Sequence, residues 1–423
     1  MNPAFSELYE VLPRQIVWKA ELLFTGVKYN PALTEAVAEG AAQNYWPYRK
    51  IAADGTGEMV PVPYLFKLDN AVARVRVNDA SEYEVRREGS GYMLFGSGKP
   101  LCDVEFVREH SWASFRTSDG ATYSEAGVEQ LGDMLVVNLT PGCEYFMTKT
   151  SCKFCGYGRF NAKTQALGQL PGIIQPHSRT LERLGEVLAN AAKSGEARHV
   201  YIVGGSTLKP EEEVDRFVPV IKTARKAVGD SMHVTAGSGA VDKDGSRQYL
   251  DAGADTCCYN LETWDAATFE AVCPGKAKFV GRDRWIKGLT DAVDVFGRGN
   301  VASAFVAGVE APPPAPGMTT EQMLASIKEG AGFLLDHGIT PLYSPLWPVD
   351  GTAYSPADGI SPTTYLKLEY DVCQMRAERN FPVPDWLICP GCSYMLMEVD
   401  FDAAFGLNEK KSDAVPRQNY DLR

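Results

Sequence analysis

Long apolar runs are missing from this sequence. No stretch of about 18 or more apolar residues occurs, so we expect no membrane-spanning helix. Residues 1–7 lack a charged start followed by an apolar core, so we expect no signal peptide. From these two absences we expect a cytoplasmic protein, whose ten cysteines would serve as reduced thiols or metal ligands rather than form disulfides.

An excess of basic residues is also missing. The 42 lysines and arginines are outnumbered by 54 aspartates and glutamates, which gives a net charge of −12. Nucleic acids and anionic membranes both favour basic surfaces, so we expect neither as a partner. Histidine is scarce, and none of the five histidines falls in a pair with metal-ligand spacing. The charge balance leaves a small-molecule substrate as the expected partner.

The sequence does have three cysteines close together after a buried strand. The apolar run 134–139 precedes Cys143, which is followed after eight residues by Cys152 and after two more by Cys155. Three thiolates are one ligand short of a closed tetrahedral zinc site, and they suit a 4Fe–4S cluster with one open iron. On local spacing alone, a zinc site, a thiol redox pair and unrelated buried cysteines stay open as alternatives.

From about residue 130 the sequence alternates between apolar strands and helices of about 12–18 residues. The predicted strands are 134–139, 199–203, 232–236, 256–261, 301–306 and 340–343. This alternation predicts parallel strands with right-handed crossovers, and so an α/β fold with a partial or full TIM-like (β/α) barrel of about six units. The active site of such a barrel lies at the carboxyl ends of its strands, where the cysteine loop would lie.

Two further regions flank the predicted barrel of residues 126–355. Residues 1–125 form a mixed, mostly β region, with short strands expected at 101–107 and 112–115 among others. Residues 356–423 form a C-terminal extension that contains Cys373, Cys389 and Cys392. These three cysteines suit an auxiliary iron–sulfur cluster or a zinc ion, and free thiols in a loop are the alternative.

Several segments together resemble the radical S-adenosylmethionine (SAM) superfamily, in its biotin synthase-like form. The matching segments, in chain order, are the cysteine loop with Phe154 before its last cysteine, 204–206, 259–263, 301–310 and 346–352. The loop departs from the usual Cys-x3-Cys-x2-Cys of the family, because its first gap is widened to eight residues. The segment 204–206 departs from the family's Gly-Gly-Glu, because Ser206 replaces the acid.

The resemblance implies the following chemistry. Cys143, Cys152 and Cys155 would each bind one iron of a 4Fe–4S cluster, and the fourth iron would bind SAM. One-electron reduction, by a donor such as flavodoxin or ferredoxin, would cleave SAM to a 5′-deoxyadenosyl radical that abstracts hydrogen from a small-molecule substrate. An enzyme of this kind is expected to be oxygen-sensitive.

The resemblance also implies residues that contact SAM. Gly204, Gly205 and Ser206 would meet the methionine part, Glu262 the ribose, and Phe154 and Val306 the adenine. Lys276, Arg282 and Arg284 are the candidates for pairing with the SAM carboxylate, and the sequence does not choose among them.

Two other functions remain as alternatives. The widened cysteine loop is compatible with cleavage of a different sulfonium bond, which would transfer a 3-amino-3-carboxypropyl group. A zinc-stabilised (β/α) barrel of binding or hydrolytic type is the alternative from another class of protein.

Overall fold

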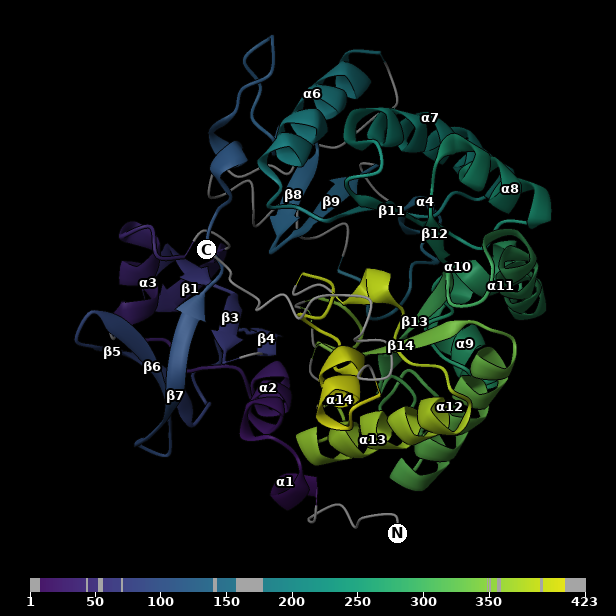
Figure 1. The fold of residues 1–423 in the computed structure, drawn as a ribbon. Helices are drawn as coiled ribbons and strands as arrows, with labels where there is room; N and C mark the ends of the chain where they lie inside the picture. The colour runs from purple at the N-terminus through teal and green to yellow at the C-terminus, as the bar shows by residue number, and fades with distance from the viewer. Residues whose placement is uncertain are drawn as a thin grey trace.

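The centre of the protein is a curved seven-stranded sheet in the order β14-β13-β12-β11-β10-β9-β8 (Figure 1). The computed structural model describes residues 8–42, 45–51, 56–69, 71–139, 143–156, 178–347, 349, 351–355, 359–388 and 391–407. The strands of this sheet are β8 (Val128–Leu131), β9 (Met134–Asn138), β10 (His199–Val203), β11 (His233–Gly237), β12 (Thr256–Cys258), β13 (Val301–Ala307) and β14 (Thr340–Pro345). Strands β9 to β14 run parallel, and β8 pairs antiparallel with β9. Among the described residues β8 and β14 do not pair with each other, so the predicted (β/α) barrel is confirmed as a partial barrel.

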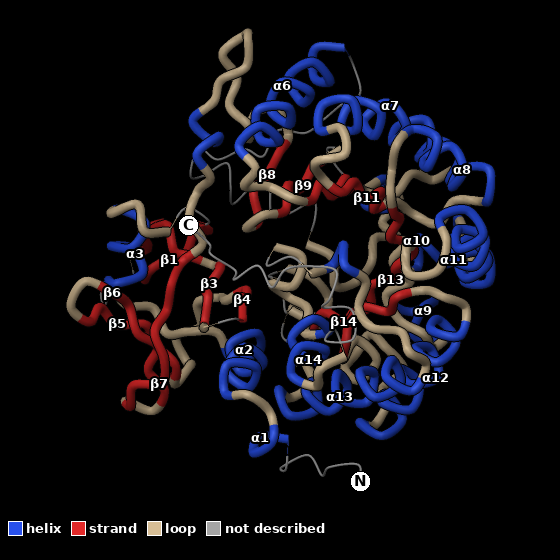
Figure 2. Tube along the Cα trace, in the orientation of Figure 1, coloured by secondary structure: helices blue, strands red, loops and turns tan. Residues whose placement is uncertain are grey.

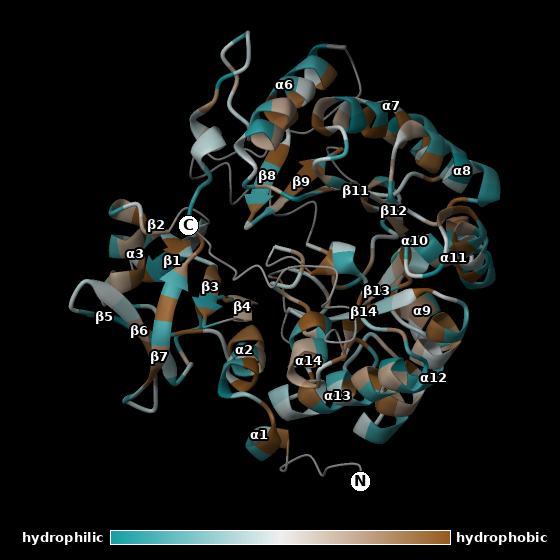
Figure 3. Ribbon diagram, in the orientation of Figure 1, coloured by the Kyte–Doolittle hydropathy of each residue, from teal (hydrophilic) through white to brown (hydrophobic). Residues whose placement is uncertain are grey.

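Helices cover the convex face of this sheet (Figure 2). They are α6 (Ser178–Ser194), α7 (Pro210–Val228), α8 (Lys243–Ala252), α11 (Arg282–Phe296), α12 (Thr320–Asp336) and α13 (Pro362–Glu378). Two shorter helices after β12, α9 (Ala266–Val272) and α10 (Pro274–Phe279), lie beside the cysteine loop. The strands are nearly continuously apolar because both of their faces are buried (Figure 3). Val200 and Ile202 of β10 pack against the helices, whereas Tyr201 points to the concave interior.

The N-terminal region contains three helices and two antiparallel sheets. Its helices are α1 (Leu8–Val11), α2 (Arg14–Thr25) and α3 (Pro31–Ala38), and its strands are β1 (Tyr45–Ile51), β2 (Gly57–Pro63), β3 (Leu65–Leu68), β4 (Ala71–Arg74), β5 (Tyr83–Glu88), β6 (Gly91–Gly96) and β7 (Lys99–Phe106). Strands β1 and β2 form a hairpin, and the other five form a sheet in the order β4-β3-β7-β6-β5. The predicted boundaries between the three regions, near residues 125 and 355, stay predictions.

One expected strand in this region is wrong. Residues 112–115 do not form a strand, because a 3-10 helix, η1 (Ser111–Ser114), lies there. The Phe115 amide donates to the carbonyl of Trp112 at 2.9 Å, so the backbone satisfies itself locally instead of pairing with another strand. The Trp112 ring is buried in edge contact with the Tyr123 ring. The aromatic residues here therefore belong to a packed turn and not to a strand.

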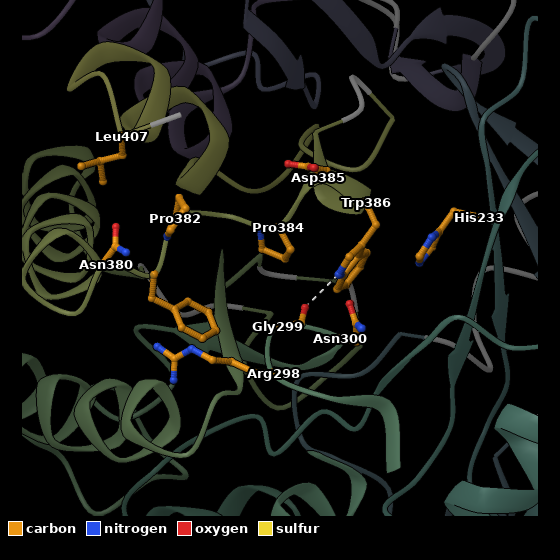
Figure 4. Close-up of a pocket in the computed structure, with 11 residues that line it drawn as sticks. His233, Arg298, Gly299, Asn300, Asn380, Pro382, Pro384, Asp385, Trp386 and Leu407 are labelled. Carbon is orange, nitrogen blue, oxygen red and sulfur yellow. Dashed lines mark hydrogen bonds between the residues drawn. The ribbon is translucent and has the colours of Figure 1, made fainter. Parts of the chain in front are cut away.

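The C-terminal extension lies against the amino-terminal ends of the parallel strands. It contains η2 (Asp385–Leu387) and α14 (Glu398–Ala404). The ring of Trp386 stacks on His233, the first residue of β11, with centroids 5.6 Å apart. The Cys392 sulfur lies 3.0 Å from Nδ1 of His199, the first residue of β10. A pocket of about 720 Å³ opens beside Trp386 and His233 (Figure 4). It is at the edge of the sheet opposite the cysteine loop.

A buried carboxyl group between α13 and α14 lacks a cation of its own. Arg376 pairs with Asp402 at 2.5 Å, and both side chains are fully buried. Glu369 is also fully buried, and within the described residues no hydrogen bond reaches either of its oxygens. Burial, together with the neighbouring Glu398, raises the pKa of Glu369 well above its usual value. Burial in the folded protein therefore favours the protonated form of Glu369.

Glu369→Gln is expected to stabilise the protein, and more so as the pH rises. The unfolded chain releases this proton above pH 4.5, whereas the folded protein holds it, so the stability of the wild type falls as the pH increases beyond 4.5. Glutamine has no such proton, and we expect a gain of about 1–3 kcal/mol at pH 8 and a gain near zero at pH 5. Urea denaturation at both pH values measures this, and an equal effect at both would contradict the argument.

Candidate active site at the carboxyl ends of the strands

The cysteine loop follows β9 and is fixed at both of its ends. Cys143 is the N-cap residue of the short helix α4 (Glu144–Met147). The carboxylate of Glu144 accepts a hydrogen bond from the Leu208 amide at 2.9 Å and pairs with Arg216 at 2.8 Å. At the other end, the Lys153 amide donates to the Val272 carbonyl at 2.8 Å. The loop is therefore tied both to the segment after β10 and to the segment after β12, at the edge where a barrel binds its ligands.

Gly205 is packed against the first cysteine of the loop. A Cβ at position 205 would lie 2.4 Å from both the Cα and the N atom of Cys143. The neighbouring Ser206 carbonyl accepts a hydrogen bond from the Glu144 amide at 2.9 Å. The sequence predicted close backbone approach at Gly204 and Gly205, and the structure shows it at Gly205, although the contacting group is the cysteine loop itself.

Gly205→Ala is expected to displace the cysteine loop. The clash involves backbone atoms and cannot be relieved by a rotamer change, so we expect a loss of about 1–3 kcal/mol in the free energy of unfolding and a lower iron content after reconstitution. The matched control is Gly185→Ala in α6, where the new Cβ meets only Thr223 Cγ2 at 3.6 Å. That variant should keep its iron and gain up to about 1 kcal/mol from the helical alanine. A normal iron content in Gly205→Ala would contradict the prediction.

A buried ion pair lies beside the second cysteine. Lys276 Nζ is 2.6 Å from the Glu262 carboxylate and 2.5 Å from the Asn260 carbonyl. Burial disfavours the charged amine, yet the charges of Glu262 and Cys152 hold the pKa of Lys276 well above its usual value. The Cys152 thiol is hydrogen-bonded to Cys273, and this bond lowers the pKa of Cys152. Of the three candidate cations, Lys276 is the one beside the cysteine loop.

Glu262 also has an unusual backbone. Its φ is +76°, which is uncommon for a residue with a side chain and occurs mainly where the surroundings require it. The Val306 amide donates to the Glu262 carbonyl at 2.9 Å, so two of the predicted SAM-contacting residues are adjacent. The sequence predicted a functional role for Glu262 but gave no indication of its left-handed backbone conformation.

A second buried carboxylate lies beneath the Gly-Gly-Ser segment. Glu213 of α7 accepts hydrogen bonds from the Thr207 amide at 3.1 Å and from the Gly239 amide at 2.5 Å. Burial raises the pKa of Glu213 to about 7, in spite of these two bonds. Glu213 therefore joins the loop after β10 to the loop after β11. Sequence reasoning missed this residue, because it is seven positions beyond Ser206 and on a helix.

The remaining predicted contacts divide into two groups. Phe154 is half-buried and packs against the main core, next to the cysteines. Arg282, in contrast, donates to the Trp264 carbonyl at 2.6 Å and 3.0 Å and lies over the Trp264 ring. Arg284 is exposed on α11. The structure thus gives Arg282 a structural partner and leaves Arg284 in solvent, and their contact with SAM stays a prediction.

A site for a single metal ion needs several donor side chains close together. Across the part of the chain that the structure describes, no three His, Cys, Asp or Glu side chains stand close enough together to hold a single metal ion. The three ligands of an iron–sulfur cluster bind different irons, so this finding concerns sites for single ions. Cys373 is buried, with its thiol 3.8 Å from Asp402. Cys389 lies outside the described residues, and Cys392 is disulfide-bonded, contrary to the expectation that the cysteines are reduced. The second metal site remains a prediction, and it would require this disulfide to be reduced.

The residues present fit an iron–sulfur cluster. Three thiols in one loop are the donor set that such clusters use. The loop is held by backbone contacts on both sides and lies next to the Lys276–Glu262 pair, which offers polar groups for a charged cosubstrate.

No helix in the described residues is long and apolar enough to cross a membrane.

A curated protein and several solved structures are similar to this chain. No family model matches the chain. A curated relative, the bacteriochlorophyllide c C-7(1)-hydroxylase of Chlorobaculum limnaeum, is 22% identical over 299 residues, which are 68% of this chain and 69% of the relative. Methylornithine synthase is similar in structure, with 17% identity, a TM-score of 0.41, and 58% of this chain and 62% of that chain covered. A radical SAM methyltransferase from Sphaerobacter thermophilus has 13% identity and a TM-score of 0.41, with 76% and 83% covered. One of these similar structures is named as a radical SAM enzyme, as the resemblance in the sequence led us to expect.

Proposed function

We propose that this chain is a radical SAM enzyme that acts on a small-molecule substrate by hydrogen abstraction. The observation that carries the proposal is the fixed loop with Cys143, Cys152 and Cys155 at the carboxyl edge of a partial (β/α) barrel. When bound there, a 4Fe–4S cluster with an open iron supplies the electron that cleaves SAM to the 5′-deoxyadenosyl radical. The curated relative is named as a hydroxylase, and an oxidative reaction that begins with hydrogen abstraction is consistent with that name.

The chain's own residues would bind, orient and shield the reactants. Gly204, Gly205 and Ser206 present their backbone beside the cysteine loop, where the methionine part of SAM would lie. Glu262 accepts a hydrogen bond from Lys276 and still has a second carboxylate oxygen for a ribose hydroxyl. Phe154 and Val306 are half-buried and offer apolar contact to the adenine. Holding SAM in one orientation is the protein's main contribution to such a reaction.

The proposal extends to the conditions under which the protein works. We propose a one-electron donor such as flavodoxin or ferredoxin, because the site needs single electrons from outside the chain. An exposed cluster would be damaged by oxygen, so we propose an oxygen-sensitive enzyme that works in the reducing cytoplasm. An auxiliary iron–sulfur cluster or zinc ion at Cys373, Cys389 and Cys392 remains part of the proposal.

The product of reductive SAM cleavage tests the proposed reaction. The protein is reconstituted anaerobically with iron and sulfide, reduced with dithionite and incubated with SAM, and the nucleoside products are separated by chromatography. We expect brown protein and 5′-deoxyadenosine. Methylthioadenosine would instead identify transfer of the 3-amino-3-carboxypropyl group. A colourless protein that binds zinc tightly and leaves SAM intact would overturn the radical mechanism.

A further inference from the structure

The partial barrel is open between β8 and β14, and the N-terminal region lies on this open side (Figure 1). Two of its hydrogen bonds to the barrel show this. Trp347, which follows β14, donates its indole N–H to the Leu23 carbonyl at 2.8 Å. On the other side, the Tyr64 hydroxyl donates to Glu129 of β8 at 3.1 Å. The N-terminal region therefore supplies the wall that a complete barrel would form from its own strands.

The side chain that this wall places in the interior is Arg74, the last residue of β4. Its guanidinium carbon is 4.5 Å from the ring centroid of Trp46 and 4.8 Å from that of Trp347. The rings of Tyr64 and Tyr394 are 5.8 Å and 5.7 Å away. Four aromatic rings from four separate segments thus surround one cation, an arrangement that holds the guanidinium in place and removes much of its water.

Among the described residues, the half-buried Arg74 differs from the fully buried cations Lys19, Lys276 and Arg376 in having no acidic partner. Lys19 is 2.6 Å from Asp400, Lys276 is 2.6 Å from Glu262, and Arg376 is 2.5 Å from Asp402. Among the described residues no carboxylate lies within 4.0 Å of a nitrogen of Arg74; its guanidinium meets the weak acceptor Met395 Sδ at 3.1 Å and the neutral hydroxyl of Tyr394. The buried Nε of Arg74 has no hydrogen-bond partner in the same part of the chain. A partly desolvated guanidinium of this kind favours binding of an anion.

Glu129 is an acidic group near Arg74 that does not pair with it. Burial raises the pKa of Glu129, while Arg74 and the Tyr64 hydroxyl act in the opposite direction. Its Oε1 already accepts the hydrogen bond from Tyr64. The negative charge of Glu129 therefore opposes the positive charge of Arg74 without occupying its nitrogens. A substitution of Glu129 offers a second way to change the affinity of Arg74 for an anion.

The surroundings of Arg74 connect with the candidate active site. Trp347 follows β14, and the cysteine loop follows the parallel strand β9, so both lie toward the carboxyl edge of the sheet. In the interior, Tyr394 belongs to the same apolar cluster as Tyr201 and Cys258. The Cys258 thiol donates to Asn260 at 3.1 Å, and Asn260 in turn accepts from Lys276. A series of contacts through this apolar cluster thus links the rings around Arg74 to the residues beside Cys152.

We propose that Arg74 binds a carboxylate of the substrate, and that Trp46, Trp347 and Tyr394 contact its apolar, unsaturated body. This inference rests on the proposed function, because it assigns the substrate class of that same site. An arginine fork matches a carboxylate in geometry, and the half-buried rings favour flat apolar groups over sugars or peptides. The substrate class is therefore an unsaturated carboxylic acid with little other charge.

Two probes of equal shape test this assignment on the anaerobically reconstituted protein. The probes are 1-naphthoate, which carries a carboxylate, and 1-naphthamide, which is neutral, and binding is measured by isothermal titration calorimetry. We expect the wild type to bind 1-naphthoate at least about tenfold more tightly than 1-naphthamide, which is the range for hydrogen bonds to charged groups. Equal binding of the two probes, or a preference for inorganic phosphate, would overturn the assignment.

Variants at two positions separate a binding role from a structural one. Arg74→Gln should weaken 1-naphthoate at least about tenfold and leave 1-naphthamide nearly unchanged, whereas Arg74→Lys should restore part of the loss. Glu129→Gln should tighten 1-naphthoate about two- to fivefold, because a competing negative charge is removed. This opposite sign keeps the assignment falsifiable even when Arg74→Gln does not fold. Formation of 5′-deoxyadenosine from SAM by the wild type tests the proposed function separately. Failure of the radical SAM function and failure of the carboxylate site are therefore distinguishable.

Discussion

Cys152→Ala is expected to abolish binding of the iron–sulfur cluster while leaving the fold intact. A 4Fe–4S cluster with three protein thiolates loses a third of its protein ligands, and the iron content should fall from about four atoms per chain to below one. The fold should survive because Cys152 lies in a loop whose backbone is held by other residues, among them Glu144 and Lys153. Iron analysis, visible absorbance and circular dichroism of the reconstituted variant measure both parts.

The same result is expected for Cys143→Ala and Cys155→Ala, since the three thiols act as one set. Cys102→Ala is the matched control, because Cys102 is a half-buried thiol of β7 in the N-terminal region. That variant should keep the full iron content and should form 5′-deoxyadenosine from SAM as the wild type does. Loss of iron in the control as well, or retention of iron after any of the three loop substitutions, would contradict the assignment of the cluster ligands.

The central sheet could be predicted from the sequence because its strands are buried on both faces. The predicted strand 199–203 coincides with β10, and 301–306 differs from β13 by one residue. Strand β8 was missed. It is only four residues long and is joined to β9 by the two-residue turn of Gly132 and Asp133, so it has no helix to separate it from the next strand.

The candidate site could be predicted only where it is local in sequence. The three cysteines lie within 13 residues, so their spacing could suggest them as one set, and their role as cluster ligands stays a prediction. Cys273, between α9 and α10, and Lys276 of α10 lie beside this loop, and Glu213 of α7 binds the loop after β10. No pattern of spacing reveals contacts between such distant segments. Arg74 is a clearer example, because four rings from residues 46 to 394 meet around it and neither its neighbours in sequence nor its strand indicate this.

Lys276→Met is expected to cost about 3–5 kcal/mol of folding stability, because it removes one partner of a buried ion pair. The side chains of Lys276 and Glu262 are only 8% and 15% exposed, so water cannot replace the lost ammonium group. The Asn260 carbonyl loses its bond to Lys276 as well. We also expect SAM binding to weaken, since Glu262 would then carry an uncompensated charge beside the cosubstrate.

A second substitution distinguishes the ion pair from simple loss of packing. In the double variant Lys276→Met with Glu262→Gln, no unpaired charge remains, so most of the lost stability should return even though SAM binding does not. Lys287→Met on α11 is the matched control, because Lys287 is 70% exposed and its pair with Asp291 is solvated, and its effect should stay within about 0.5 kcal/mol. If Lys276→Met proved as stable as this control, the pair would not hold the segment after β12 beside the cysteine loop, and the polar side of the SAM site would have to lie elsewhere on the carboxyl edge.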